Sequence, residues 1–178
     1  MKKTVLFSNF SGFVFVSIVG TLLHFVFDWS HQNIIVGMFS AVNESIWEHV
    51  KLLFFPLVLF FIIQYKFARN PQNAHCANFY AVLAGTTAIP ALYYLYTGAL
   101  GVNIDWFNIL IFYISSAISF FARYKTIKNK GNCYLSPAIT NTIIAIITLL
   151  FIIFTFMPMH IPLFIDPLDQ TYGYFKST

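Results

Sequence analysis

Long apolar runs separated by short polar segments dominate the chain. A helix needs roughly 20 residues to cross the hydrocarbon core of a bilayer. The runs that reach or approach this length lie at about 5–27, 50–67, 78–100, 104–124 and 136–157. The pattern therefore predicts an all-α, polytopic membrane helix bundle with five transmembrane helices. We expect a single integral membrane domain over residues 1–178.

Two segments outside these runs are not ordinary solvated loops. The first, SHQNIIVGMFSAVNES, is too short to span a membrane and too apolar for a loop in water, so we expect an interfacial or re-entrant element there. The second, residues 158–178, contains Pro158, Pro162 and Pro167, which exclude a continuous helix. This C-terminal segment either folds back over the end of the bundle or anchors in the headgroups through its aromatic residues.

Composition supports the same class. Hydrophobic residues make up 58% of the chain and charged residues only 9%, whereas soluble domains carry about 25% charged residues. The net charge of +4 does not indicate nucleic-acid binding, because the basic residues lie in short clusters at the ends of apolar runs. Walker and GxGxxG motifs are absent, so nucleotide binding has no support. The partner that we expect is the lipid bilayer.

The basic residues indicate an orientation, because cytoplasmic segments carry an excess of Lys and Arg. With the N-terminus inside and the C-terminus outside, only Lys51 and Lys176 fall outside. The other basic residues fall inside: Lys2, Lys3, Lys66, Arg69, Arg123, Lys125, Lys128 and Lys130. We therefore expect a multi-pass protein of the plasma membrane in this orientation.

The same orientation separates the chemically active side chains. Cys76 and Cys133 fall inside, where thiols are usually reduced, so we expect no disulfide. All acids and most histidines fall at the outer side: Asp28, Glu44, Glu48, Asp105, Asp166, Asp169, His24, His31, His49 and His160. The outer end of the bundle is where we expect chemistry.

His24 and Asp28 lie near the outer end of the first run. The i, i+4 spacing puts both on one helix face, and ionisable groups at membrane depth usually face the bundle interior. Two interpretations remain open. His24 is a metal ligand, or a histidine oriented by the Asp28 carboxylate; alternatively, it is an interfacial histidine hydrogen-bonded to a nearby acid.

The stretch FSAVNESIWEHVK concentrates charge directly before the second run. Within it, Ser45 and Glu48 form an S-x-x-E capping box, in which Ser45 caps the helix amides and Glu48 returns to the Ser45 amide. Lys51 would then extend to the headgroups. The capping box leaves Asn43, Glu44 and His49 unexplained.

A polar group near hydrocarbon needs a partner, so Asn43, Glu44 and His49 together suggest a preorganised site. If the C-terminal segment folds back, it brings His160 and Asp166 towards this cluster.

Three strings, HFVFDWS, VNESIWEHVKLLFFP and HIPLFIDP with TYGY, resemble one family of small bacterial integral membrane proteins of unknown function. The resemblance covers nearly the whole chain and implies a polytopic, mainly bacterial membrane protein, without an activity or a ligand set. As a chemical analogy and not as homology, the chain also resembles ceramidase-like and progestin-receptor-like membrane hydrolases. These place a Ser-x-x-x-His pair with further His and Asp residues around zinc. Ser45 and His49 match that pair, but the last run lacks the His-x-x-x-His pair of those hydrolases.

The first functional hypothesis is a metal-dependent hydrolase of a lipid, or of an amide or ester that reaches the outer face. His24, His49 and His160 would bind zinc, the usual three protein ligands plus water, and Asp28 would orient one histidine. Glu44 or Glu48 would act as general base to the bound water. The catalytic set would also include Ser45, and the supporting residues would be Asp28, Asn43, Lys51 and Asp166.

The second hypothesis is a non-enzymatic membrane protein, such as a ligand- or ion-binding, transport or assembly subunit. The polar residues deeper within the expected helices are Ser and Thr and carry no charge. Charge-coupled transport is therefore weakly supported, and a binding or assembly role stays open.

Overall fold

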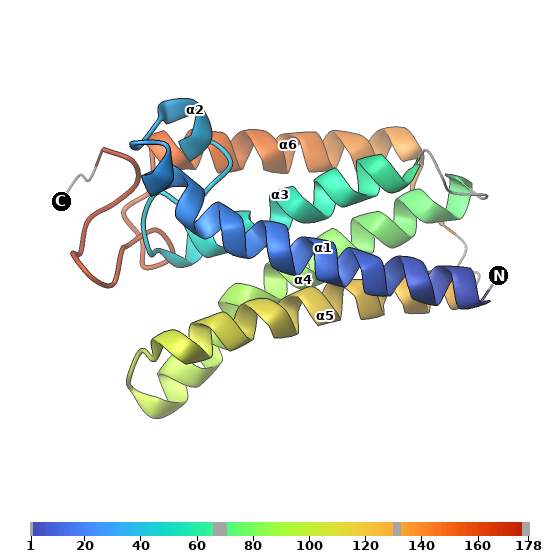
Figure 1. Cartoon of the computed structure of the whole chain (residues 1–178), viewed down its shortest axis with the longest axis horizontal. Coiled ribbons are helices and arrows are strands. Elements are labelled where there is room, and N and C mark those ends of the chain that lie inside the picture. The colour runs from blue at the N-terminus through green and yellow to red at the C-terminus, as the bar shows by residue number, and fades with distance from the viewer. Residues whose placement is uncertain (1, 66–70, 130–132, 176–178) are drawn as a thin grey trace.

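The computed structural model describes residues 2–65, 71–129 and 133–175, and within these ranges the chain is built from α-helices (Figure 1). Lys66, Arg69, Lys130 and Lys176, used above for the orientation, and the last two residues of the run 50–67 lie outside the described residues. The helices follow in the order α1 (Lys2–Trp29), α2 (Ile34–Gly37), α3 (Ile46–Tyr65), α4 (Pro71–Leu100), α5 (Asp105–Lys128) and α6 (Pro137–Phe156).

The long helices run roughly along one axis, and α4 and α5 form a hairpin that diverges from the others at one end (Figure 1). At that end lie α2, the connection from α2 to α3, and the segment that follows α6. We call it the site end. The N-terminus lies at the opposite end, the N-terminal end, together with the start of α4.

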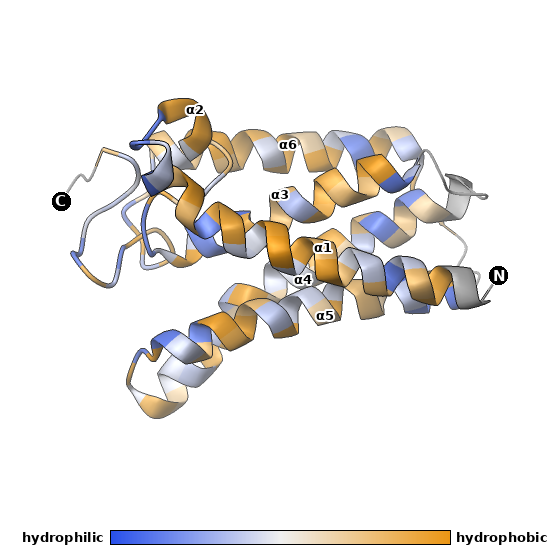
Figure 2. Ribbon diagram, viewed as in Figure 1, coloured by the Kyte–Doolittle hydropathy of each residue, from blue (hydrophilic) through white to orange (hydrophobic). Residues whose placement is uncertain are grey.

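Helices of a membrane-spanning type are present. Four of the described helices are long and apolar enough to cross a bilayer: Val5–Trp29, Ile46–Tyr65, Asp105–Lys128 and Pro137–Phe156. Hydrophobic residues cover much of these helices, and hydrophilic residues gather in the connections at the site end (Figure 2). The expected span 78–100 is helical within α4, but α4 is not among the four. The five-span topology and its orientation therefore stay predictions.

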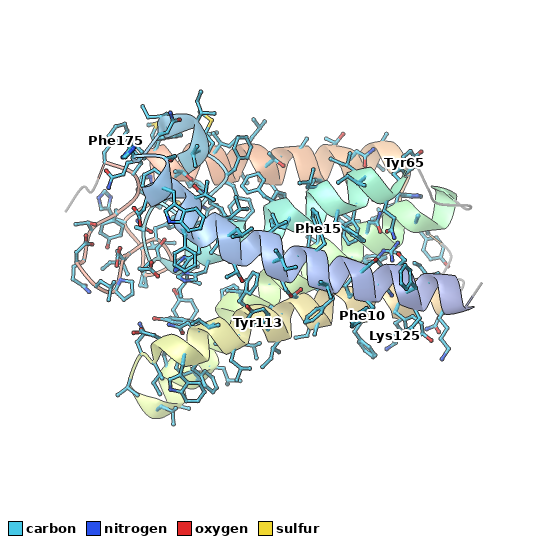
Figure 3. All side chains as sticks on the ribbon, viewed as in Figure 1. Phe10, Phe15, Tyr65, Tyr113, Lys125 and Phe175 are labelled. Carbon is cyan, nitrogen blue, oxygen red and sulfur yellow. A yellow bond between two sulfur atoms is a disulfide. The ribbon has the colours of Figure 1, made fainter. Side chains whose placement is uncertain are left out.

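The core forms around α3, which packs against α1 and α4. Leu53, Phe54 and Leu57 are completely buried. Phe15 of α1, labelled in Figure 3, packs on Phe60 of α3 with ring centroids 5.7 Å apart. This contact packs the second half of α3 against α1.

The element expected between the first two runs is the short helix α2. Asn33 caps it, because its Oδ1 accepts a hydrogen bond from the amide of Ile35 at 2.9 Å. The side chains of Ile34 and Ile35 are exposed. An ordered element is thus present, and its placement at the membrane surface stays a prediction.

The C-terminal segment folds back over the site end. The amide of Trp47 donates to the carbonyl of Leu163 at 3.0 Å, and the amide of Tyr174 donates to the carbonyl of Thr155 at 2.8 Å. The hydroxyl of Tyr174 also donates to the carbonyl of Gln32 at 2.9 Å. Of the two alternatives for this segment, the fold-back is therefore the correct one.

Cys76 and Cys133 are joined in a disulfide. The structure differs here from the expectation of no disulfide. Charge patterning sorts residues by the side of the membrane and contains no information on their distance. The start of α4 and the segment before α6 lie next to each other, which brings the two sulfurs together.

Candidate metal site at the end of the bundle

Three side chains from three different segments meet at the site end. His24 comes from α1, Glu44 from the connection between α2 and α3, and His49 from the first turn of α3. His24 Nε2 lies 3.7 Å from Glu44 Oε1, and His49 Nε2 lies 3.5 Å from Glu44 Oε2. One ligand atom from each residue lies within 4.8 Å of the others. A single metal ion could therefore contact all three.

The backbone around Glu44 is fixed on both sides. Asn43 Oδ1 accepts a hydrogen bond from the amide of Ser45 at 3.0 Å. Asp166 Oδ2, from the C-terminal segment, accepts from the amide of Glu44 at 3.1 Å. Asp166 is buried, and its other oxygen accepts from the amide of Leu168 at 2.8 Å. Asn43 and Asp166 thus hold the turn from which the Glu44 side chain projects.

The tautomer of His49 follows from its contact with the backbone. Its Nδ1 lies 2.9 Å from the carbonyl oxygen of Ser45. A carbonyl only accepts hydrogen bonds, so Nδ1 carries the hydrogen. In neutral His49, Nε2 then has the free lone pair, and this is the atom nearest Glu44. A histidine that donates through one ring nitrogen and presents the other is the usual arrangement of a metal ligand.

The spacing of the three side chains suits a metal better than direct hydrogen bonds. Hydrogen bonds from nitrogen to oxygen span about 2.7–3.2 Å, shorter than the 3.5 and 3.7 Å that separate the histidines from Glu44. Nitrogen and oxygen ligands about 2.0–2.1 Å from a tetrahedral zinc ion are about 3.3–3.5 Å apart. Two histidines and one glutamate also form a known catalytic zinc ligand set.

Asp28 does not visibly orient His24. Among the described residues, Nδ1 of His24 is buried and has no hydrogen-bond partner. Asp28 follows one turn later and is exposed. The proposed orienting role of Asp28 stays a prediction.

A pocket borders the cluster on the side of the α4–α5 hairpin. Its cavity volume is about 20 Å³, and a cavity of roughly 10–15 Å³ is enough for one water molecule. The polar residues that line it are Glu44, His49, Tyr93, Asn103 and Asn108. A metal ion held by the cluster would have room for a water molecule on this side.

Sequence reasoning missed the polar group on the far wall of this pocket. Asn108 Nδ2 donates to Asn103 Oδ1 at 2.9 Å, and the hydroxyl of Tyr96 donates to Asn108 Oδ1 at 2.6 Å. The available signal was the pair of asparagines that flank Asp105, at the start of an apolar run.

Glu48 and Lys51 have a different role from the one expected. Both side chains are enclosed, with relative exposures of 1% and 0%, and Lys51 Nζ lies 2.7 Å from Glu48 Oε2. The extension of Lys51 to headgroups is wrong, because it pairs with Glu48 and donates to the carbonyl of Gly37 at 2.8 Å. Glu48 is thus paired and inaccessible, which argues against its expected role as general base.

The capping box is half formed. Ser45 Oγ accepts from the amide of Glu48 at 3.4 Å, as expected. The Glu48 carboxylate, however, accepts from the amide of Val42 at 3.1 Å, while the Ser45 amide is bonded to Asn43. Ser45 is only 1% exposed, which disfavours the catalytic role inferred from the Ser-x-x-x-His match.

His160 is not part of the cluster. Its side chain is exposed and packs against Tyr172, with ring centroids 4.7 Å apart. The returning segment approaches α3 through Leu163 and Asp166, which leaves His160 further out on the loop. Glu44 thus occupies the position beside the two histidines that was expected for His160.

Over residues 4–174 the chain matches the model of the Family of unknown function (DUF6512), and it belongs to this family. This confirms the resemblance to a family of unknown function. Neither a curated protein nor a solved structure matches the chain. The more distant likeness to membrane hydrolases therefore gains no support from named relatives.

Proposed function

We propose that this member of the DUF6512 family is an integral membrane metalloprotein that binds one zinc ion through His24, Glu44 and His49. The observation that carries the proposal is the contact of His49 with Glu44. Its Nδ1 is committed to the Ser45 carbonyl, so its Nε2 lone pair and the Glu44 oxygen, 3.5 Å away, are both electron-pair donors.

Two such donors are held together most readily by a cation between them. A shared proton would draw His49 and Glu44 to hydrogen-bond distance and would leave His24 unexplained. A metal ion uses all three side chains, and the two distances to Glu44, 3.5 and 3.7 Å, are close to those between ligands of one zinc ion. Zinc fits best, because it accepts imidazole and carboxylate ligands in tetrahedral geometry.

The proposal includes a location. α4 packs against α5, and this supports α4 as a fifth span beside α5, although α4 is less apolar. Five spans with the N-terminus inside then place the metal site at the outer face of a bacterial plasma membrane. The distribution of Lys and Arg supports this orientation.

The candidate activity is hydrolysis of an amide or ester in a lipid-like substrate. Three protein ligands leave one zinc position for water, and zinc lowers the pKa of that water to about 7. The pocket beside Glu44 and His49 gives this position its space. The amide groups of Asn103 and Asn108 offer donors to a substrate carbonyl on the opposite wall.

A non-catalytic metal-binding role is the second candidate, and the carboxylates favour it. Glu44 is used as a ligand, Glu48 pairs with Lys51, and Asp166 accepts two backbone hydrogen bonds. Of the acids discussed, only the exposed Asp28 is left beside the cluster to act as a base.

Metal content tests the proposal. The full chain is purified in detergent with its disulfide intact, stripped with a chelator, loaded with zinc and measured by mass spectrometry of the metal. We expect one zinc per chain, a strong loss in His24→Ala and His49→Ala, and no loss in the control His160→Ala. Equal zinc content in all four proteins would refute the site.

An assay of hydrolysis distinguishes the hydrolase from the non-catalytic metal-binding role. The zinc-loaded protein is incubated with an N-acyl amide lipid and with a phospholipid ester in micelles, and the released fatty acid is measured. Release that requires zinc and disappears in His49→Ala supports the hydrolase. Stoichiometric zinc without release supports the non-catalytic role.

A further inference from the structure

A second cluster of metal-binding side chains lies at the N-terminal end. Cys133 Sγ is 3.1 Å and Cys76 Sγ is 3.8 Å from Nε2 of His75. These ligand atoms lie within 4.8 Å of one another. The cluster therefore brings two sulfurs and one imidazole to one point.

Two separate parts of the chain build this cluster. His75 and Cys76 lie near the start of α4, and Cys133 lies 57 residues beyond Cys76, shortly before α6. The carbonyl of Leu135 is 3.0 Å from both His75 Nε2 and Cys133 Sγ. Directly afterwards, Ser136 caps α6 by accepting a hydrogen bond from the amide of Ile139. His75 and Cys76 are thus held within α4, and Cys133 lies shortly before the capped start of α6.

The cluster is accessible from the end of the bundle. Cys76 is 1% exposed, whereas His75 and Cys133 are partly exposed. An ion or a small thiol can therefore reach one sulfur of the pair, while the other is enclosed by protein.

The surrounding charge indicates the compartment that this end faces. Arg123, Lys125 and Lys128 lie in the last turns of α5 at the same end; Lys125 is labelled in Figure 3. The acids of the sequence, by contrast, belong to segments at the site end. A Lys- and Arg-rich end is typical of the cytoplasmic side, where low-molecular-weight thiols keep cysteines reduced.

We propose that His75, Cys76 and Cys133 form a second metal site, which binds a thiophilic ion such as Zn²⁺ or Cu⁺ when the cysteines are reduced. The disulfide is the oxidised, metal-free state of this site. Two molecules of a low-molecular-weight thiol reduce it: they supply two electrons and two protons, and they leave as their own disulfide. Metal binding then releases the two thiol protons.

The ligand set distinguishes this site from the one at the site end. Thiolates select Zn²⁺ and Cu⁺, whereas a carboxylate such as Glu44 suits harder ions. In a tetrahedral zinc site, sulfur and nitrogen ligands are about 3.5 Å apart. The two sulfur–nitrogen distances, 3.1 and 3.8 Å, lie on either side of this value. Once the sulfur–sulfur bond is cleaved, the sulfurs have to move apart to admit the ion. His75 also has to release the Leu135 carbonyl and move its ring hydrogen from Nε2 to Nδ1, so that Nε2 presents a lone pair.

The first test uses Cd²⁺ as a probe for thiolate ligands. The full chain in detergent is reduced with dithiothreitol, freed of the reductant under anaerobic conditions, and titrated with Cd²⁺. We expect an ultraviolet thiolate-to-cadmium absorption band that saturates at one ion per chain. The oxidised protein and Cys133→Ser should lack the band, and His24→Ala/His49→Ala should retain it. A reduced protein with two titratable thiols and no band would overturn the proposal.

The second test needs no substitution, so it does not depend on whether a variant folds. The alkylation of Cys76 and Cys133 by N-ethylmaleimide is followed by mass spectrometry, with and without one equivalent of Cd²⁺. Cd²⁺ should slow alkylation at least tenfold, and equal rates would refute the site.

The redox state in cells is a separate test. In cells treated with N-ethylmaleimide at lysis, we expect both cysteines to be alkylated. A complete disulfide there would overturn the reduced state. Neither result depends on zinc at His24, Glu44 and His49.

Discussion

Lys51 Nζ lies 2.7 Å from Glu48 Oε2, and both side chains are enclosed one turn into α3. Lys51 also donates to the carbonyl of Gly37 in α2 and to Thr155 Oγ1 in α6, at 2.8 and 2.7 Å. The ion pair thus links α2, α3 and α6 directly beneath the turn that carries Glu44 and His49. We infer that the ion pair holds that turn in place.

Removal of one charge of this pair should destabilise the protein strongly. In Lys51→Met, the Glu48 carboxylate stays buried without its partner, which typically costs about 3–5 kcal/mol. We expect a marked decrease in the melting temperature in detergent, measured by tryptophan fluorescence.

The double variant Glu48→Gln/Lys51→Met is the matched comparison. It removes both charges and should recover part of the lost stability. A Lys51→Met protein as stable as the unsubstituted chain would show that the pair does not hold the site end together.

Asp166 should affect metal binding without contacting the metal. Its carboxylate accepts the Glu44 amide, and loss of such an outer-shell contact typically lowers metal affinity 10–100-fold. We expect Asp166→Asn to bind zinc about tenfold more weakly in a competition titration with a chelating dye. Asp169→Asn is the control, because Asp169 accepts hydrogen bonds from Thr171 in an exposed turn. Identical affinities of both variants would exclude a positioning role for Asp166.

Substitution of Ser45 distinguishes a role as a helix cap from a role as a catalytic hydroxyl. Its Oγ accepts the Glu48 amide, and loss of an N-cap typically costs about 1 kcal/mol. Ser45→Ala should therefore be slightly less stable and should bind zinc as before. Loss of zinc binding at unchanged stability would instead favour the arrangement of the ceramidase-like hydrolases.

The topology can be tested with two single cysteines in a Cys76→Ser/Cys133→Ser background. Five spans place Asp169→Cys outside and Lys128→Cys inside. In intact cells, a membrane-impermeant maleimide should then label only the first. If α4 does not cross the bilayer, the labelling pattern is reversed. An N-terminus outside would reverse the pattern as well, so reversed labelling would contradict the combination of five spans with the N-terminus inside.

The helices were largely predictable because a span is a local property of the sequence. The runs 5–27, 104–124 and 136–157 correspond to α1, α5 and α6, with ends that differ by a few residues. The gathering of acids and histidines at one end was also predictable, since helix direction alternates along the chain. His24, Glu44 and His49 were all candidates for that reason.

Assignments that depend on the path of a loop or on distant partners were not predictable. The partner of Lys51 in α6, Thr155, is 104 residues away. In the sequence, the capping box explains Ser45 and Glu48 as local contacts, so the pattern gives no sign that Glu48 pairs with Lys51. Likewise, the segment after α6 could present either His160 or Asp166 to the site, because its prolines exclude a helix without setting a path. In the structure, Asp166 is the residue that contacts the Glu44 backbone, and Glu44 is the third residue of the cluster.

The most direct test of the metal site is X-ray absorption spectroscopy at the zinc edge on the oxidised, zinc-loaded full chain. With Cys76 and Cys133 joined, the spectrum should report only the ligands at the site end. We predict a four-coordinate zinc ion with nitrogen and oxygen ligands at about 2.0–2.1 Å, two of them imidazoles. In His49→Ala, one imidazole should be lost. A spectrum with six oxygen ligands and no imidazole, unchanged in His49→Ala, would contradict the assignment of His24, Glu44 and His49 as a metal site.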